Sequence, residues 1–144
     1  MNIKQALKRK NKLVVLIQQE YAKMISYNSY EAGTVRPYSA VEAMGKWNGY
    51  INELIDLKTA IHRANRPVYD KIFRLSELKS QVKQLRSLNC TEGKERNMYS
   101  RETEPILKTA EIGLLKRDEM VSVMEAEIED IQEKLDVYNA ITEI

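Results

Sequence analysis

The stretch IKQALKRKNKLVVLIQQEYAKM, at residues 3–24, contains the clearest periodic signal in the sequence. One row of residues recurs at alternating steps of four and three, at Ile3, Leu7, Lys10, Val14, Ile17, Tyr21 and Met24. Such steps are typical of a coiled-coil helix, which turns one apolar row toward a neighbouring helix. The stretch therefore predicts a first helix over about residues 2–31, with Lys10 as a polar interruption.

The next two segments repeat the pattern. Ser39 and Glu42 have the spacing of a capping box, which predicts that a second helix spans about residues 39–64. Its row consists of Met44, Trp47, Ile51, Leu54, Lys58 and Ile61. Asn65-Arg66-Pro67 ends that helix, because the residue before a proline is biased away from helix. A third helix is expected over about residues 68–88, and its row consists of Leu75, Leu78, Val82 and Leu85.

The last helix is expected over about residues 109–140, with Thr109 as its N-cap. Its row consists of Leu114, Arg117, Val121, Met124, Ile128, Ile131, Leu135 and Tyr138. Lys10, Lys58 and Arg117 interrupt three of the four rows, and polar residues in such rows often set the number of partners in a coiled coil. The rows therefore predict oligomerisation as well as helices.

The composition agrees with a helical fold. The chain has 144 residues, of which 31% are charged and 43% apolar, and it has only five glycines and three prolines. Few helix breakers and many charges favour long helices over a sheet, and the apolar fraction is too high for a disordered chain. We predict a single mainly α domain over residues 1–144, built as an antiparallel, coiled-coil-like bundle of four helices.

The one long segment outside these helices is residues 89–108, predicted to be a long loop or a short β-ribbon made by residues 97–100 and 106–108. Its polar residues Tyr99, Ser100, Arg101 and Glu102 are a candidate contact surface. Three apolar residues, Met98, Ile106 and Leu107, are expected to anchor the segment on the helices.

Two further surfaces are candidate sites. Tyr27, Tyr30, Tyr38 and Trp47 gather around the first connection between helices, as ordinary packing or as an aromatic tip that binds a partner. Lys4, Lys8, Arg9 and Lys12 form a basic patch near the N-terminus, while residues 118–144 carry nine acids and one base. Packing of the first helix against the fourth would pair these charges; the alternative is a basic surface for phosphates or anionic lipid.

The sequence contains no motif that indicates catalysis. It has no glycine-rich phosphate loop, a single histidine, His62, and a single cysteine, Cys90, so we predict no enzyme activity, no metal site and no cofactor. The lone cysteine fits a reducing, cytoplasmic setting. The apolar run at residues 13–17 is too short for a signal peptide, and no run has the length of a membrane span.

Several stretches resemble an uncharacterised family of small bacterial helical proteins, some of which carry the name septicolysin. The similar stretches are IKQALKRKNKL, LIDLKTAIHRANR, LSELKSQVKQLRSL and MYSRETEPILKTAEI, in the same helix order. Two signatures carry the resemblance: the turn at Ala64-Asn65-Arg66, and Tyr99-Ser100-Arg101 followed by Lys108 and Thr109. The resemblance implies no catalytic residues. The name implies pore formation, for which the sequence offers no spanning segment or amphipathic hairpin.

These observations favour a non-enzymatic interaction or scaffold protein that self-associates through its long helices. The alternative is a nucleic-acid-associated accessory protein that uses basic patches at residues 2–12 and 71–101. The net charge of only +2 does not favour this alternative, because strong nucleic-acid binders have a larger basic excess.

Overall fold

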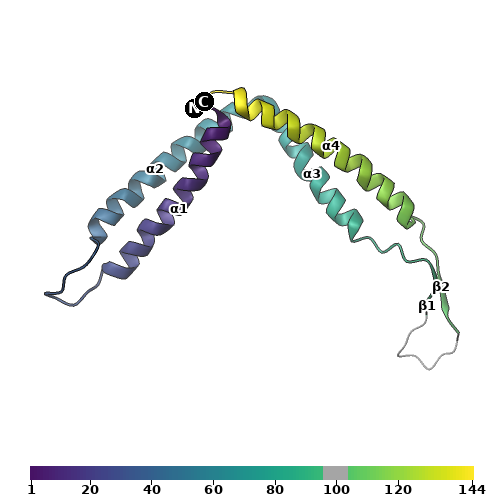
Figure 1. The fold of residues 1–144 in the computed structure, drawn as a ribbon, viewed down its shortest axis with the longest axis horizontal. Helices are drawn as coiled ribbons and strands as arrows, with labels where there is room; N and C mark the ends of the chain where they lie inside the picture. Colours follow the sequence, from purple (N-terminus) through teal and green to yellow (C-terminus); the bar gives the residue numbers. More distant parts are fainter. Residues whose placement is uncertain (96–103) are drawn as a thin grey trace. The chain divides into compact units, whose positions relative to one another are not determined.

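The computed structural model describes residues 1–95 and 104–144 (Figure 1). In these ranges the chain forms four α-helices: α1 (Ile3–Tyr27), α2 (Ala40–Ala64), α3 (Tyr69–Arg86) and α4 (Leu114–Ile141). A short 3-10 helix, η1 (Arg66–Val68), precedes α3, and two strands, β1 (Gly93–Glu95) and β2 (Ile106–Lys108), lie between α3 and α4. The prediction of a mainly α protein with four helices is confirmed.

The chain divides into two compact units, which we describe separately. Unit 1 comprises Met1–Tyr69 and Asp136–Ile144, and unit 2 comprises Asp70–Leu135. Unit 1 is built on the α1–α2 hairpin, and unit 2 on α3, the ribbon and most of α4. The single-domain organisation stays a prediction.

Local hydrogen bonds set the ends of α1. The side chain of Asn2 accepts a hydrogen bond from the backbone N–H of Gln5, and the side chain of Gln5 accepts one from the backbone N–H of Asn2. Both of these backbone donors at the start of the helix are therefore satisfied. The helix ends at Tyr27, four residues earlier than predicted. Arg36 donates to the Tyr27 carbonyl at 2.8 Å, and Gly33 adopts a φ of 82° in the turn that follows. These contacts make residues 28–39 a structured connection.

The start of α2 confirms the sequence signal. Ser39 is the N-cap, and its hydroxyl accepts from the backbone N–H of Glu42. The helix ends at Ala64, and Pro67 lies in η1, where its missing N–H costs no helical hydrogen bond. The predicted break at residues 65–67 is therefore confirmed.

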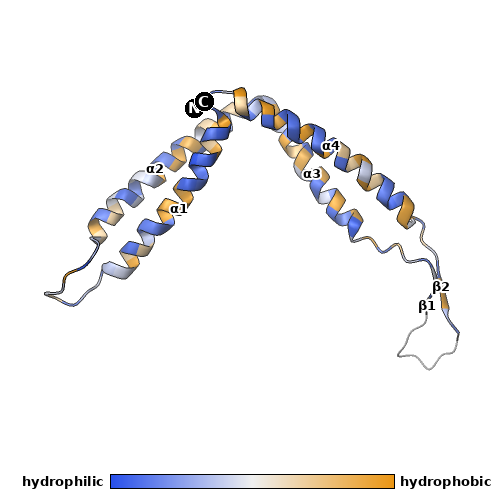
Figure 2. Cartoon of the chain, in the orientation of Figure 1, coloured by the Kyte–Doolittle hydropathy of each residue, from blue (hydrophilic) through white to orange (hydrophobic). Residues whose placement is uncertain are grey.

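The helices α1 and α2 pack side by side and antiparallel (Figure 1). Arg9 near the start of α1 contacts Glu53 in the second half of α2, whereas Tyr27 at the end of α1 contacts Tyr38 just before α2. Hydrophobic residues recur along both helices among hydrophilic ones (Figure 2). The fully buried members on α1 are Ile3, Ala6 and Leu13.

The rows of residues that α1 and α2 turn toward each other, here called the inward rows, differ from the predicted rows at every second position. Leu13 is fully buried while Val14 is 41% exposed, and Glu20 is buried while Tyr21 is exposed. On α2, buried or half-buried residues recur at Ala40, Ala43, Trp47, Tyr50, Leu54, Leu57, Ile61 and Ala64. Met44 and Lys58 are exposed, so the predicted row is wrong by one residue at these positions, and Lys58 does not interrupt the packing.

The two ends of the chain meet in unit 1 (Figure 1). Asn2 forms an antiparallel β-bridge with Glu143, and the Ile3 N–H donates to the Thr142 carbonyl at 3.0 Å. The Tyr138 hydroxyl donates to the carbonyl oxygen of Ala64 at 2.7 Å, close to the end of α2. The last residues of the chain thus close the end of the hairpin that lies opposite the 28–39 connection.

In unit 2 the predicted rows are largely confirmed. Leu75, Leu78 and Val82 are buried on α3, and Val121, Ile131 and Leu135 are buried on α4. Two ion pairs join these antiparallel helices: Arg74 Nε lies 2.9 Å from Glu127, and Arg86 contacts Glu125. Leu114 is the exception in the predicted row, because it is 55% exposed.

The segment before α4 differs from the prediction. The helix begins at Leu114 rather than near Thr109, because residues 106–108 pair with residues 93–95 and the chain needs residues 109–113 to leave the ribbon. The strand at Ile106–Lys108 agrees with the predicted ribbon, and its partner is Gly93–Glu95. Residues 97–100, the predicted partner, lie outside the described residues. Ile106 and Leu107 are exposed, so the prediction that they anchor the segment is wrong.

Candidate partner interface

The α1–α2 hairpin of unit 1 has one charged side. Arg9 Nε and Nη2 donate to the two carboxylate oxygens of Glu53 at 2.7 and 2.8 Å. This bidentate hydrogen bonding lowers the pKa of the Glu53 carboxyl below its ordinary value of 4.5 and raises the pKa of Arg9. The pair fixes the antiparallel alignment of the two helices on this side.

We expect the Arg9–Glu53 pair to make unit 1 sensitive to acid. A carboxyl whose pKa is lower in the folded than in the unfolded state stabilises the fold above its unfolded pKa. That stabilisation is lost as the pH falls through the lowered folded value, hence below about 4.5. Glu53→Gln should therefore reduce stability at neutral pH and flatten the loss of stability in acid, as measured by thermal unfolding from pH 7 to pH 3.

The control for that measurement is Asp56→Asn, which removes a carboxylate from the same helix. Asp56 is exposed and takes part in no ion pair that the described residues show. Its replacement should leave the acid slope close to that of the parent. Equal slopes for the Glu53 and Asp56 variants would contradict a special role for the Arg9 pair.

The opposite side of the hairpin is apolar. We call it the apolar face, and its exposed members are Val14, Tyr21 and Ile25 on α1 and Val41, Met44 and Ile55 on α2. Their exposed fractions range from 41% for Val14 to 81% for Val41. In an antiparallel helix pair, the residues that directly follow the inward-row residues in sequence lie on the same side of the pair on both helices. The residues of the apolar face occupy such positions, whereas Arg9 and Glu53 lie on the other side.

A groove confirms that the two helices share this face near the 28–39 connection. It has a volume of about 360 Å³. Its lining residues are Met24, Ile25, Asn28, Ser29, Ala40, Val41 and Met44. Two methionines in such a groove allow its shape to adapt to an apolar side chain.

The apolar face carries no charge over most of its length. The polar residues at its positions from Leu7 to Ile25 and from Val41 to Ile55 are Asn11, Gln18 and Asn48, all of them neutral. The lysines of the face, Lys4 and Lys58, lie at the end where the chain termini meet. A long uncharged strip of this kind is unusual on a chain with 31% charged residues.

The predicted aromatic tip is brought together in part. Tyr27 and Tyr38 rings lie 5.6 Å apart between their centroids, and Lys23 Nζ lies 4.6 Å from the Tyr38 centroid. Tyr30 stacks under the guanidinium of Arg36, at 3.7 Å. Trp47 is separate from these three and pairs with Tyr21, at 6.3 Å between centroids.

The predicted aromatic tip did not include two cations that belong to this cluster, Lys23 and Arg36. Arg36 both covers Tyr30 and caps the carbonyl of Tyr27, while Lys23 contacts Tyr38 and pairs with the buried Glu20 at 3.2 Å. A partial signal was present, since Arg36 lies six residues from Tyr30, whereas Lys23 lies 15 residues from Tyr38. The tip is therefore an ordered cation–aromatic cluster that borders the groove.

The predicted basic patch separates into two parts. Lys4, Lys8 and Lys12 are exposed and lie one helical turn apart, with no ion pair among the residues that the structure describes. Arg9 turns instead toward α2 and Glu53. The ionic partners of Glu125 and Glu127 come from α3, and Glu143 contacts the terminal amino group of Met1 at 2.7 Å.

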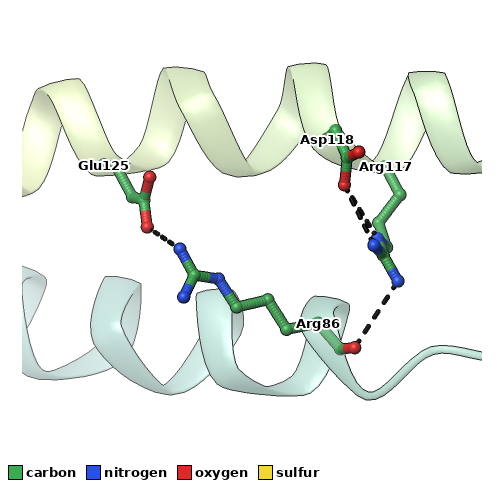
Figure 3. Close-up of polar contacts among 4 residues, drawn as sticks. All are labelled: Arg86, Arg117, Asp118 and Glu125. Carbon is green, nitrogen blue, oxygen red and sulfur yellow. Dashed lines mark hydrogen bonds and ion pairs between the residues drawn. The ribbon is translucent and has the colours of Figure 1, made fainter.

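The second basic region, residues 71–101, is partly neutralised. Arg74 and Arg86 both bind carboxylates of α4, and the Arg86 carbonyl accepts a 3.5 Å hydrogen bond from Arg117 (Figure 3). Arg117 also pairs with Asp118 at 3.0 Å (Figure 3). Arg117 thus donates to a backbone carbonyl at the C-terminal end of α3, which explains why a cation occupies a position in the α4 row.

The segment at 89–108 contributes an open pocket of about 410 Å³ in unit 2. Its lining residues are Leu88, Asn89, Thr91, Lys108, Thr109, Ala110, Glu111 and Ile112. The candidate contact surface at Tyr99, Ser100, Arg101 and Glu102 lies outside the described residues.

In the part of the chain that the structure describes, no three His, Cys, Asp or Glu side chains are grouped as metal ligands. No helix there combines the length and apolar character that a membrane crossing requires. Comparison with known proteins adds no assignment, since no family model, curated protein or solved structure matches the chain.

Proposed function

We propose that the protein is a non-enzymatic interaction or scaffold protein that self-associates through the α1–α2 hairpin. The observation that carries this proposal is the apolar face, with six large apolar side chains exposed on two adjacent helices. Contiguous apolar patches on soluble proteins are typical of interaction sites. The lack of a catalytic motif in the sequence motivates the non-enzymatic part of the proposal.

The size of the face suits a stable partner. Both helices have 25 residues, which corresponds to a length of about 37 Å, and two helices side by side are about 20 Å wide. The face therefore extends over on the order of 750 Å². A standard protein interface buries roughly 800 Å² on each partner, so this face alone provides nearly that area.

The proposal is tested by light scattering and sedimentation at tens of micromolar, with Ile25→Glu as the decisive variant. Ile25 is 65% exposed on the apolar face, and an unpaired carboxylate buried there should weaken association by at least about tenfold. The matched control is Val15→Glu, which adds the same charge to α1 at a 51% exposed position outside the face. Circular dichroism should show unchanged helix content in both variants.

Self-association of the parent that Ile25→Glu weakens and Val15→Glu preserves would support the proposal. A parent that remains monomeric at these concentrations would contradict it. Equal effects of the two substitutions would mean that association does not use the apolar face.

Nucleic-acid association is the second candidate, and the exposed row of Lys4, Lys8 and Lys12 favours it. Its weakness is that Arg74 and Arg86 of the other basic region already bind carboxylates. If phosphate contacts contribute, affinity for double-stranded DNA or RNA must fall steeply as salt rises. Absence of binding at low salt would exclude this candidate.

A further inference from the structure

We propose that two copies pair through their apolar faces with their 28–39 connections at opposite ends, which we call the opposed arrangement. This inference rests on the proposed self-association and adds the orientation of the partner. The two-fold axis runs across the helices, so that α1 lies over α1 of the second copy and α2 lies over α2. The product is a four-helix assembly in which each helix is antiparallel to the helices beside it.

The layers of the apolar face show where this axis crosses it. Ile25 and Val41 line one groove, so they lie at about the same height on their two helices. Because both helices rise equally per residue, counting seven residues back along α1 and seven forward along α2 sets Gln18 level with Asn48. Apolar layers lie on both sides of this amide layer: Val14 with Ile51, and Tyr21 with Met44.

An axis at the amide layer produces a matched interface. The apolar contacts that follow between the two copies are Val14 with Tyr21, Met44 with Ile51, and Val41 with Ile55. Gln18 meets Gln18 of the second copy, and Asn48 meets Asn48. Amide side chains both donate and accept hydrogen bonds, so these amides can satisfy one another when buried.

The charges at the end of the face distinguish the opposed arrangement from the one with both connections at the same end, the aligned arrangement. The layers match in both, because in the aligned arrangement each layer would meet its own copy. The aligned arrangement, however, gathers Lys4 and Lys58 of both copies at one end of the assembly. Like charges that are brought together at an interface oppose association, and the opposed arrangement separates them.

In the opposed arrangement these lysines lie over the 28–39 connection of the second copy. Glu31 is exposed in that connection. The arginine of the connection, Arg36, is engaged within its own chain, because it donates to the Tyr27 carbonyl and covers the Tyr30 ring. The connection therefore offers a carboxylate to the lysines. Burial of the apolar layers supplies the affinity, and the charges select the orientation.

The orientation is measured by the distance between spin labels at position 32. Ala32 is exposed in the connection, and Ala32→Cys in a Cys90→Ser background gives one label on each copy. In the opposed arrangement the labels lie more than about 37 Å apart, the length of a 25-residue helix. In the aligned arrangement they would lie within about 20 Å, the width of two helices. Double electron–electron resonance separates these distances.

Charge reversal tests why the orientation is chosen. Lys58→Glu sets a carboxylate near Glu31 in the opposed arrangement and should weaken association by about threefold. In the aligned arrangement it would relieve the repulsion from Lys4, so association would strengthen instead. Adding Glu31→Lys to Lys58→Glu should restore the parent affinity. The matched control is Lys12→Glu, which reverses an exposed charge outside the apolar face and should leave association unchanged.

Sedimentation of the labelled protein keeps the two proposals distinct. A dimer with the long distance supports the opposed arrangement. A dimer with the short distance, or association that Lys58→Glu strengthens, overturns this arrangement while self-association stands. A monomer at tens of micromolar contradicts both proposals.

Discussion

Replacement of Leu13 by alanine should lower the free energy of unfolding by about 2–5 kcal/mol, the usual range for a buried leucine. Leu13 is 0% exposed in the inward row of α1, and the rigid helix pair cannot fully close the space that its side chain leaves. Urea unfolding followed by circular dichroism measures the loss. It should be done on dilute protein, where association adds nothing to stability.

The adjacent residue supplies the comparison. Val14 is 41% exposed, and Val14→Ala should change the free energy of unfolding by less than about 1 kcal/mol. The pair of variants distinguishes the observed inward row from the one that periodicity predicts. A larger loss for Val14→Ala than for Leu13→Ala would show that the α1–α2 packing is wrong.

A loss of similar size is expected for Leu78→Ala in unit 2. Leu78 is 1% exposed between its neighbours in the α3 row, Leu75 and Val82, and its truncation should cost about 2–5 kcal/mol. The matched control is Leu115→Ala on α4, since Leu115 is 75% exposed. Its truncation should stay within about 0.5 kcal/mol of the parent. Equal losses would contradict the α3–α4 core.

Periodicity predicted the α3 and α4 rows correctly except at Leu114, but it placed those of α1 and α2 wrongly at alternate positions. On α1 two rows compete, because Leu13 and Val14 are both apolar and differ by one position. The pattern favours Leu7, Val14 and Tyr21 as the more apolar row. The structure instead buries Ala6, Leu13 and Glu20 on α1, facing a row on α2 that begins with the small residues Ala40 and Ala43. Small residues let two helices approach closely.

The second apolar row is what produces the apolar face. A helix that served a single hairpin would need one row, whereas α1 carries both. Both rows are therefore visible in the sequence, but periodicity assigned the wrong one to the contact between α1 and α2. Choosing between two neighbouring rows requires the shape of the facing helix, which a single periodic pattern does not contain.

The ends of the elements were predicted unevenly for local reasons. Ser39 caps α2 through its side chain, and Pro67 lacks the N–H that a helix interior needs, so the residue type alone predicted both ends of α2. Tyr27 ends α1 because a side chain nine residues away, Arg36, satisfies its carbonyl. The start of α4 depends on the pairing of β2 with Gly93–Glu95, a contact that no local pattern specifies.

The bridge between Asn2 and Glu143 has a consequence for the order of folding. The N-terminal amino group and its carboxylate partner are separated by 142 residues. A chain made from its N-terminus can form the α1–α2 hairpin early, since those contacts are close in sequence. The N–H of Ile3 and the carbonyl of Met1 acquire their partners at Thr142 and Ile144 only after those residues have been synthesised. The apolar face is thus complete on the growing chain before unit 1 can close.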